Sequence, residues 1–154
     1  MICAELQYNP RLRLRVRQRV SDLPVRARES SDVESMETAT AAYEITDYSV
    51  MPGVECPCGI ARRGLMEEPS VPYSLHLTQI EMNAKRHYHR RITETYFILQ
   101  CESDACMELN DQRVPVRPEM AITIHPGTWH RAIGRMRVVI VASPKFDPAD
   151  EWLE

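Results

Sequence analysis

The sequence lacks any apolar run of the roughly 20 residues that a membrane-spanning helix requires. Its first residues also lack the apolar centre of a secretory signal, because RLRLRVRQRV at 11–20 interrupts every apolar residue with an arginine. The net charge is only −3 at pH 7, which gives no electrostatic reason to expect binding to nucleic acid or to an anionic membrane. These absences predict a cytoplasmic protein that binds neither nucleic acid nor a membrane.

The sequence also lacks a C-x-x-C pair. Its cysteines, an odd number, are Cys3, Cys56, Cys58, Cys101 and Cys106. In a reducing cytoplasm we expect most of these residues to be thiols. An alternative is a bridge between Cys101 and Cys106, which flank the predicted hairpin tip ESDA. We interpret Cys56 and Cys58 as structural or incidental thiols.

Two segments of the chain differ in composition. Residues 1–40 are rich in arginine and then in small polar side chains, a composition that buries little apolar surface. We therefore expect an N-terminal extension over 1–40 and a single domain over 41–154. Within the extension, Leu12, Leu14 and Val16 alternate with arginines, so an edge strand is the alternative to an unstructured tail.

From residue 43 onward, short apolar runs alternate with turns built from Pro, Gly, Asn and Asp. This texture predicts an all-β sandwich or barrel. The expected strands cover 43–50, 59–65, 73–82, 85–90, 93–101, 106–116, 120–125, 130–134 and 135–143. Only the last segment, FDPADEWLE, looks helical, because Asp147 can cap a helix that has Pro148 at its first position. We predict an all-β domain with a short C-terminal helix.

Potential metal ligands lie in KRHYHRRITETYFIL, residues 85–99. Residues i and i+2 of a strand face the same side, so His87 and His89 project together. Glu94 opens the next strand and lies beside them if the two strands form a hairpin, and His130, after the turn HPGTW, is the fourth candidate. Imidazoles with one carboxylate suit a divalent Fe, Mn, Ni, Zn or Cu ion. An H-x-H pair alone, however, is more often a solvated or hydrogen-bonded pair.

The whole arrangement resembles the cupin family, whose motifs are G-x5-H-x-H-x3,4-E-x6-G and G-x5-P-x-G-x2-H-x3-N. Here HYHRRITETYFILQC keeps His87, His89 and Glu94, and EMAITIHPGTWHRAIG keeps Gly127 and His130. The resemblance covers roughly residues 70–142. The turn and packing positions that depart from the motifs are Cys101, Glu119, His125 and Gly134. These departures affect local loop shapes rather than the ligands.

The resemblance implies an antiparallel jelly-roll β-barrel with a metal and a small-molecule substrate or ligand inside it, and a homodimer. By parity along the strand, a Glu94 that faces inward takes Tyr96 and Ile98 inward too, which makes both candidate pocket residues. Tyr96 could hydrogen-bond a ligand, or it could be a wall residue whose hydroxyl is satisfied by the backbone.

Weaker candidates lie outside the ligand set. One of the adjacent residues Arg62 and Arg63 should face inward, where its guanidinium could bind a substrate carboxylate or phosphate; the alternative is a solvated pair at the rim. Tyr96 and His125 are the only candidates for proton transfer.

His76 is a further histidine near the proposed site. We expect it to point away from the face that buries Leu75 and Leu77, and therefore not to be a ligand.

Three classes of function remain open. The first is a metal-dependent enzyme acting on a small molecule, with dioxygenase-type or isomerase/lyase-type chemistry. The second is a non-catalytic barrel that binds or senses a small ligand. The third is a purely structural barrel, against which the four intact ligands argue. Cupins host many chemistries on one fold, so the fold does not decide among these classes.

Overall fold

A computed structural model describes residues 43–154 of the chain. The extension predicted over 1–40, with its alternative edge strand at Leu12, Leu14 and Val16, lies outside the described residues. No helix within 43–154 has both the length and the apolar character to cross a membrane. The elements are β1 (Val54–Cys56), β2 (Gly59–Gly64), β3 (Ser74–Ile80), β4 (His87–Tyr88), β5 (Thr93–Cys101), β6 (Cys106–Leu109), β7 (Gln112–Pro115), β8 (Ala121–Ile124), β9 (His130–Ile133), β10 (Met136–Ser143), the 3-10 helix η1 (Pro148–Asp150) and β11 (Trp152–Leu153).

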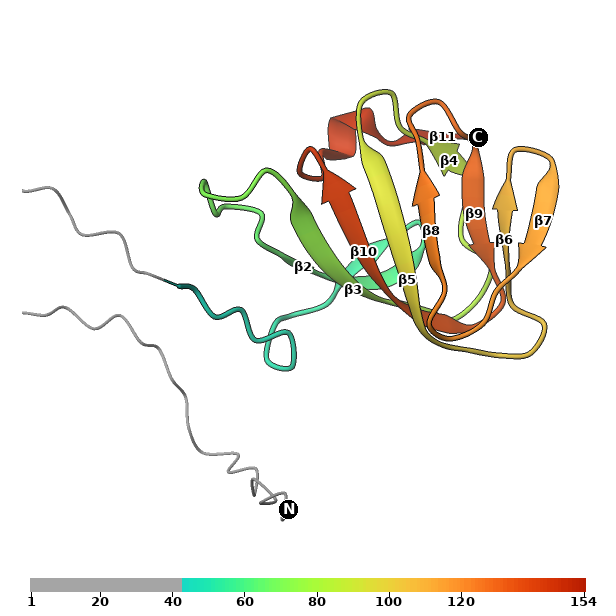
Figure 1. The fold of residues 1–154 in the computed structure, drawn as a ribbon, viewed down its shortest axis with the longest axis horizontal. Helices are drawn as coiled ribbons and strands as arrows, with labels where there is room; N and C mark the ends of the chain where they lie inside the picture. Colours follow the sequence, from blue (N-terminus) through green and yellow to red (C-terminus); the bar gives the residue numbers. More distant parts are fainter. Residues whose placement is uncertain (1–42) are drawn as a thin grey trace, which may run out of the picture. The chain divides into compact units, whose positions relative to one another are not determined.

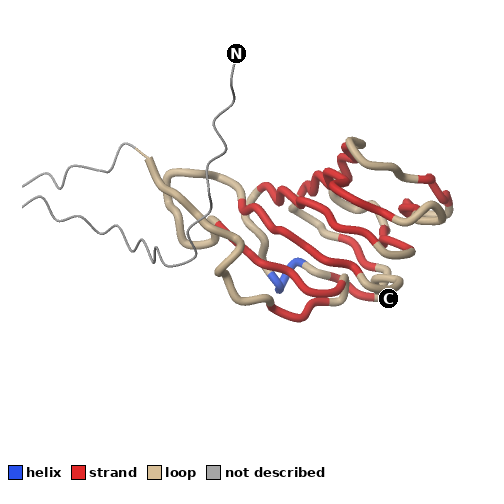
Figure 2. The backbone as a smooth tube through the Cα atoms, turned by 90° about the horizontal axis from the view of Figure 1, so that it is seen from below, coloured by secondary structure: helices blue, strands red, loops and turns tan. Residues whose placement is uncertain are grey.

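The strands form two antiparallel sheets. One sheet has the order β1-β2-β3-β10-β5-β8 and the other has the order β11-β4-β9-β6-β7. Figure 1 shows the first sheet on the left and the second on the right, and Figure 2 shows the strands from below. The two sheets form a cupin-like jelly roll, which confirms the predicted all-β fold.

The interior follows from the alternation of side chains along the central strands. In β10, Met136, Val138, Ile140 and Ala142 are buried and the residues between them are more exposed. Because β10 pairs with both β3 and β5, its inward residues meet inward residues of both neighbours. Successive residues of a strand face opposite sides, so one apolar stripe on each strand suffices to build the core.

The inward side chains change from apolar to polar along these strands. Ile80 pairs with Met136 at one end of β3 and β10. Ser74 and Glu94 flank Ala142 at the other end. We call the region around Ile80, Ile98, Met107, Val138 and Met136 the apolar end of the interior. The polar end is the region around Ser74, His76, Glu94 and the other three candidate ligands.

The predicted C-terminal helix is wrong in length. Asp147 caps the segment by accepting a hydrogen bond from the Ala149 N–H at 2.9 Å, and Pro148 occupies the first helical turn, as expected. The helix is nevertheless a single 3-10 turn, because Glu151 returns to an extended conformation (φ −96°, ψ 106°). Trp152 and the residue after it then pair with β4 as an additional strand.

Other boundaries also differ from the prediction. Residues 43–50 form no strand, whereas β1 and β11 were not predicted. The predicted strand over 106–116 is a hairpin, since Asn110 has a positive φ of 52° and ends β6 before β7 begins. Short elements at sheet edges carry too few residues to show a period, which explains these errors.

The cysteines were partly mispredicted. Cys56 and Cys58 form a disulfide, because the turn between β1 and β2 brings their Cα atoms to 5.2 Å. Cys101 and Cys106 are free, as expected, so the alternative bridge between them does not form. Cys3 lies outside the described residues.

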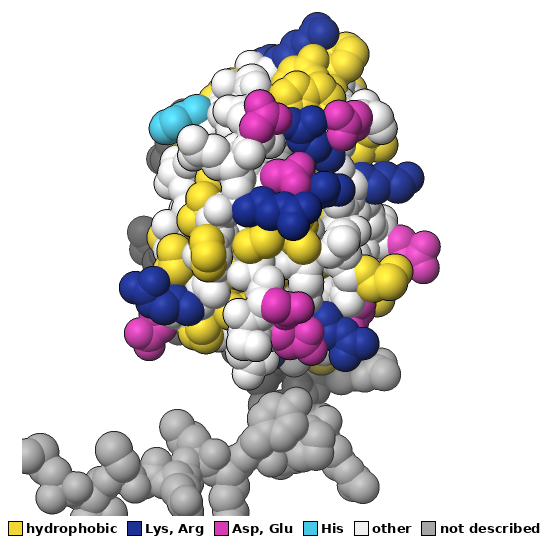
Figure 3. Space-filling view, turned by 90° about the vertical axis from the view of Figure 1, so that its right-hand side faces the viewer, with side chains coloured by type: hydrophobic (Ala, Val, Ile, Leu, Met, Phe, Trp, Pro, Cys, Tyr) yellow, Lys and Arg dark blue, Asp and Glu magenta, His cyan; other side chains and the backbone are white. Residues whose placement is uncertain are grey.

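Charges of both signs are mixed on the face of the molecule that Figure 3 shows. In the sheet that contains β6 and β9, Glu108 forms ion pairs with Arg131 at 3.0 Å, Arg86 at 3.5 Å and Arg113 at 3.6 Å. This network places acids among the arginines rather than leaving a patch of one sign.

Candidate metal centre

The four predicted ligands meet at the polar end of the interior. His87 lies in β4, and His89 is the first residue after that strand. His130 begins β9, and Glu94 comes from β5 of the other sheet. Their exposed fractions are 3%, 2%, 1% and 5% respectively. One potential ligand atom from each residue lies within 4.8 Å of the others. The four residues therefore form the predicted cluster, but not through a hairpin, because β4 pairs with β9 and β11 while β5 lies in the other sheet.

Strand register and one turn position the histidines. His87 pairs directly with His130, and their ring centroids are 4.2 Å apart. The Gly127 N–H donates to the His89 carbonyl at 2.7 Å, which ties the HPGTW turn to the ligand strand. Gly127 has a φ of +83°, a conformation that glycine adopts without strain. The glycine retained from the second motif thus anchors the loop that carries His130.

Each ligand histidine is oriented by a main-chain carbonyl. Nδ1 lies 3.0 Å from the Lys85 oxygen in His87, 2.8 Å from the Asp150 oxygen in His89, and 2.9 Å from the Thr128 oxygen in His130. A carbonyl only accepts hydrogen bonds, so Nδ1 carries the proton in all three rings. Each neutral ring therefore presents the lone pair of Nε2 for coordination, as in protein metal sites.

The arrangement around Glu94 fits a cation. His130 Nε2 is 3.2 Å from Glu94 Oε2, and His89 Nε2 is 3.6 Å from Glu94 Oε1. In neutral rings protonated at Nδ1, these nitrogens and oxygens are all acceptors, so they need a positive centre between them. The buried His89 Nε2 has no hydrogen-bond partner. The residues present thus fit a divalent transition metal bound by three imidazoles and one carboxylate.

The pKa values show which groups resist a proton. Burial, and then the neighbouring His130, lower the pKa of His87 from 6.5 to about 4. Burial disfavours ionisation of Glu94, but when the metal-free His130 and His89 carry a positive charge they outweigh burial and hold the pKa of Glu94 far below its usual range. In His89, the Glu94 carboxylate outweighs burial and raises the pKa. A negative Glu94 beside a neutral His87 at pH 7 is the state that coordinates metal.

Asp150 supports the turn between the candidate ligands His89 and Glu94, and the sequence analysis missed it. Its carboxylate accepts hydrogen bonds from the N–H groups of Arg90 at 3.3 Å, Arg91 at 3.0 Å and Ile92 at 3.2 Å. Its carbonyl accepts from His89 Nδ1 at 2.8 Å. One buried residue therefore holds both a ligand ring and the turn between two ligands. No local pattern shows this role, because 58 to 61 residues separate the partners.

Tyr96 and Ile98 both face inward, as the parity of β5 predicted. Tyr96 is 2% exposed, and its ring centroid lies 6.2 Å from that of His130. Burial, and then the neighbouring Glu94 carboxylate, raise the pKa of Tyr96 well above its usual range. Ile98 is fully buried in the apolar cluster. Tyr96 is therefore next to the candidate ligands, whereas Ile98 lies one step further toward the apolar end.

The two adjacent arginines face opposite sides. The Arg62 Nε donates to the Met51 carbonyl at 3.0 Å on the outside of the sheet. Arg63 pairs across strands with the buried His76, and its guanidinium lies 4.2 Å from the centroid of the Phe146 ring. The inward-facing member of the pair is therefore Arg63.

His76 is not one of the four clustered residues, as expected, but its orientation was mispredicted. It is 4% exposed and lies 2.9 Å from Ser74 Oγ, whereas Leu75 and Leu77 are only half-buried. Burial, and then the charge of Arg63, lower the pKa of His76 to about 4. The inward face of β3 at this end therefore carries polar residues, Ser74 and His76, rather than its leucines.

Glu151 is a second residue that the sequence analysis missed. It is half-buried, and it follows Asp150, whose carbonyl holds His89. Burial raises the pKa of Glu151, while the nearby His89 and Arg63 oppose that shift. A further carboxylate thus lies beside the four candidate ligands.

The other predicted residues lie outside the cluster. His125 is exposed, so the structure gives it no place beside the ligands. Trp129 faces away from the interior, with its ring centroid 4.7 Å from that of Tyr88. Glu119, which replaces a motif glycine, keeps the left-handed conformation with a φ of 71°. The departures from the motifs therefore leave the ligands in place.

Comparisons with known proteins agree with this fold. Neither a scan of protein-family models nor a search of curated proteins gave a match. A protein from Planctomyces limnophilus of known crystal structure is 39% identical, with a TM-score of 0.70 over 73% of this chain and 98% of that one. The nucleoside dehydratase Pac13 from Streptomyces is 19% identical (TM-score 0.63, 73% and 90% coverage). Ectoine synthase from P. lautus is 16% identical (TM-score 0.62, 73% and 90% coverage).

The fold and these neighbours define the chain as a small cupin-type protein. It belongs to the same family as the Planctomyces limnophilus protein, which it matches over nearly the whole length of that protein. The two enzymes share less than a fifth of their residues with this chain, so they support its fold and not its activity.

Proposed function

We propose that this protein is a metal-dependent enzyme that acts on a small molecule at the polar end of the barrel. The observation that carries the proposal is the alignment of three Nδ1–H groups on main-chain carbonyls, which directs three Nε2 lone pairs toward Glu94. His87, His89, Glu94 and His130 are the proposed ligands. Such a set suits Fe, Mn, Ni, Zn or Cu.

A divalent ion held by these four residues supplies Lewis-acid polarisation of a substrate oxygen or, where the ion is redox-active, dioxygen chemistry. The chain itself supplies the orientation of the ligands, and its buried apolar residues exclude water from the site. Isomerase, lyase or dehydratase chemistry requires a proton donor or acceptor as well.

Two side chains are placed to handle such a proton. Tyr96 is protonated at neutral pH because burial and Glu94 raise its pKa, so its hydroxyl donates a hydrogen bond or proton. Glu151 is a carboxylate outside the ligand set whose pKa is raised by burial. These residues replace His125 as candidates, since His125 is exposed.

A non-catalytic barrel that binds a small ligand is the second candidate function. The observation in its favour is the deep burial of all four ligands, each no more than 5% exposed. A closed site retains metal without admitting a substrate to an open position.

The metal assignment is tested by metal analysis of the purified full chain beside His87→Ala, His130→Ala and His125→Ala. We expect one equivalent of divalent metal in the wild type and in His125→Ala, and loss of most metal from the other two variants. His125→Ala is the matched control because it removes an exposed histidine outside the cluster. Equal metal content in all four proteins would refute the assignment.

Turnover is tested on the protein loaded with Fe, Mn, Ni, Zn or Cu. Oxygen uptake with small diols, thiols or keto acids would support the dioxygenase type. Conversion without oxygen uptake would support the isomerase or lyase type, and binding without conversion would support the non-catalytic alternative. The homodimer and the cytoplasmic location remain predictions, to be checked by light scattering and by fractionation of cells.

A further inference from the structure

We propose that the polar end holds a subsite for a small zwitterion, which binds its carboxylate on Arg63 and its ammonium on Glu151. The inference deepens the proposed function, on which it rests, by naming the class of ligand that reaches the metal centre. It depends on two oppositely charged side chains that line the same region from segments far apart in the sequence.

Arg63 brings a positive charge to the inward face of the sheet and is half-buried there. It lies opposite the buried His76 on the inward face of the sheet, and its guanidinium stacks on the Phe146 ring at 4.2 Å. Its buried Nε has no hydrogen-bond partner, and no carboxylate of residues 43–154 lies within 4.0 Å of it as an ion pair. A guanidinium binds a carboxylate through two parallel hydrogen bonds, so the group that completes Arg63 is an anionic oxygen pair.

Phe146 connects Arg63 to the metal centre. Its ring centroid lies 5.5 Å from that of His76 and 6.3 Å from that of His89, in edge-to-face arrangements with both. The guanidinium that stacks on Phe146 is therefore one aromatic ring away from a metal ligand.

Glu151 brings a negative charge to the same place. The pairing of Trp152 with Tyr88 and of Leu153 with His87 puts Glu151 opposite His89 in register. Trp152 stacks outside on Tyr88, so alternation turns Glu151 to the side on which His89 lies. The charges of Arg63, His89, Glu94 and His130 act on its carboxyl group.

The two charges do not neutralise each other. Arg63 and Glu151 interact electrostatically, yet they form no ion pair within 4.0 Å. Half-buried charges without a partner are costly, and that cost is offset when a ligand supplies the opposite charge to each. A singly charged ligand would satisfy one of them and leave the other, whereas a zwitterion satisfies both.

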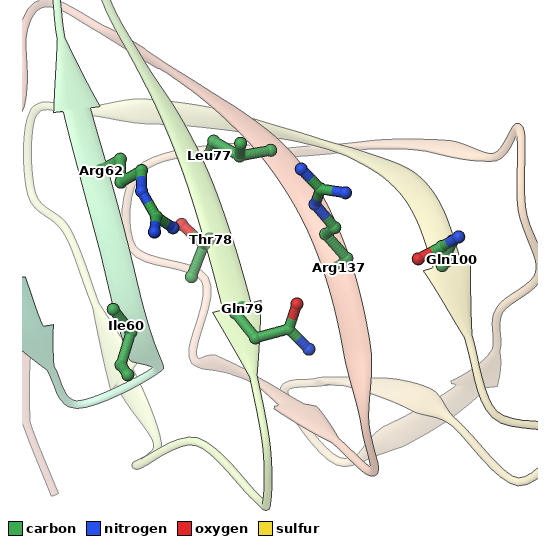
Figure 4. Close-up of a pocket in the computed structure, with 7 residues that line it drawn as sticks. All are labelled: Ile60, Arg62, Leu77, Thr78, Gln79, Gln100 and Arg137. Carbon is green, nitrogen blue, oxygen red and sulfur yellow. The ribbon is translucent and has the colours of Figure 1, made fainter. Parts of the chain in front are cut away.

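The chain offers a matched control for each charge. Arg62 adjoins Arg63 but points outward, where it lines a hollow of about 350 Å³ on the outer face of the sheet with Ile60, Leu77 and Arg137 (Figure 4). Glu154 is three residues from Glu151 but pairs with Arg86 at 2.9 Å on the surface. Neither control lies in the cluster of candidate ligands.

The first experiment measures ligand binding to the full-length protein, with its metal, by calorimetry. The zwitterions are glycine, β-alanine and 4-aminobutyrate, which separate the two charges by increasing lengths. Acetate, propionate and butyrate lack the ammonium, and methylamine, ethylamine and propylamine lack the carboxylate. We expect one zwitterion to bind about tenfold or more tightly than both of its singly charged counterparts, since each charge-assisted hydrogen bond contributes that much. Equal affinities, or no binding by any zwitterion, would overturn the proposal.

The second experiment assigns the charges to residues. Arg63→Gln should lower the affinity for the zwitterion by about 10- to 100-fold and leave the affinity for the amine unchanged. Glu151→Gln should lower the affinity for the zwitterion to a similar extent and leave the affinity for the singly charged carboxylate ligand unchanged. Arg62→Gln and Glu154→Gln should bind as the wild type does. Arg63→Lys and Glu151→Asp keep the charge and serve if a glutamine variant does not fold. Binding that is insensitive to both Arg63 and Glu151 would refute the subsite.

The subsite and the metal assignment fail separately. The same titrations on the chelated protein and on His87→Ala report the subsite without metal. If the wild type takes up no metal but binds the zwitterion in a way that depends on Arg63 and Glu151, the metal assignment alone is refuted. A full equivalent of metal with no preference for zwitterions would refute the subsite alone.

Discussion

The apolar and polar ends of the interior are built by the same strands with the same alternation, yet they differ in what their side chains need. At the apolar end, Ile80, Ile98 and Met136 are satisfied by contact with one another. At the polar end, Glu94 and the ligand histidines require specific partners at specific distances. Residues of the first kind are exchangeable with others of similar volume, whereas those of the second kind are not.

The first prediction breaks the apolar end. Ile98→Ala removes a fully buried side chain, and we expect the free energy of unfolding to fall by about 2–5 kcal/mol because a cavity remains. Metal content should not change. Urea denaturation with metal analysis measures both quantities. Leu99→Ala is the control on the outer face of the same strand, where Leu99 is 36% exposed, and its loss should be clearly smaller. A loss of metal with little loss of stability would place Ile98 in the site instead.

The second prediction concerns the pH dependence of the polar end. The folded pKa of His76 is about 4, against 6.5 in the unfolded chain. Above pH 6.5 the ring is neutral in both states. As the pH falls from 6.5 to 4, only the unfolded chain takes up the proton, so stability is lost across that window. The loss is at most about 3 kcal/mol, since each unit of pKa difference corresponds to about 1.4 kcal/mol.

Urea denaturation of the metal-free protein at several pH values tests this prediction. In His76→Leu, the decline between pH 6.5 and 4 should be shallower than in the wild type. A residual decline is expected from His87, whose folded pKa is also about 4. Identical pH profiles for the two proteins would contradict the assignment to His76.

The third prediction weakens the polar end without touching a ligand. Asp150→Asn replaces a carboxylate oxygen that accepts main-chain N–H groups of the ligand turn with an amide group. We expect metal affinity to fall by about 10- to 100-fold, as for other outer partners of ligand histidines. Asp147→Asn is the control, because Asp147 is a surface residue that caps η1 and pairs with Arg91. Competition with a metal chelator measures the affinity, and equal values for the two variants would argue against a supporting role for Asp150.

The smallest predicted effect improves the apolar end. Thr78 is fully buried, and its hydroxyl has no hydrogen-bond partner. Thr78→Val keeps the shape and removes the unpaired hydroxyl, so we expect a stabilisation of about 1 kcal/mol. Thr95→Val is the matched control, because the Thr95 hydroxyl lies 3.2 Å from that of Thr123. Removing this hydroxyl breaks a hydrogen bond and should lower the stability. Thermal melts of both variants should shift in opposite directions; a destabilised Thr78→Val would show that the hydroxyl is satisfied after all.

The sequence was sufficient for the fold class and for the cluster of candidate ligands. Period-2 alternation is strong in long strands such as β5, so the inward positions of Glu94, Tyr96 and Ile98 could be read directly. His130 could be joined to them because the spacing of the second motif resembles that of cupins. Both kinds of information are local in sequence.

The misses involve contacts between distant segments. The 61 residues between His89 and Asp150, and the pairing of β11 with β4, leave no local signal. His76 was misplaced because the apolar neighbours Leu75 and Leu77 were assumed to be buried. That assumption fails in a barrel whose interior is polar at one end, because the polar residues of a strand then face inward and its leucines face outward.

The two-residue strand β11 has a kinetic consequence. Asp150 lies just before β11. The carbonyl of Asp150 fixes His89, and the carboxylate of Asp150 fixes the turn that follows His89. When this terminal pairing opens, a ligand ring and the turn behind it lose their restraints in the same event. We therefore expect the proposed metal centre to exchange its ion at a rate set by the fraying of an edge strand, the least protected kind of element in a folded chain.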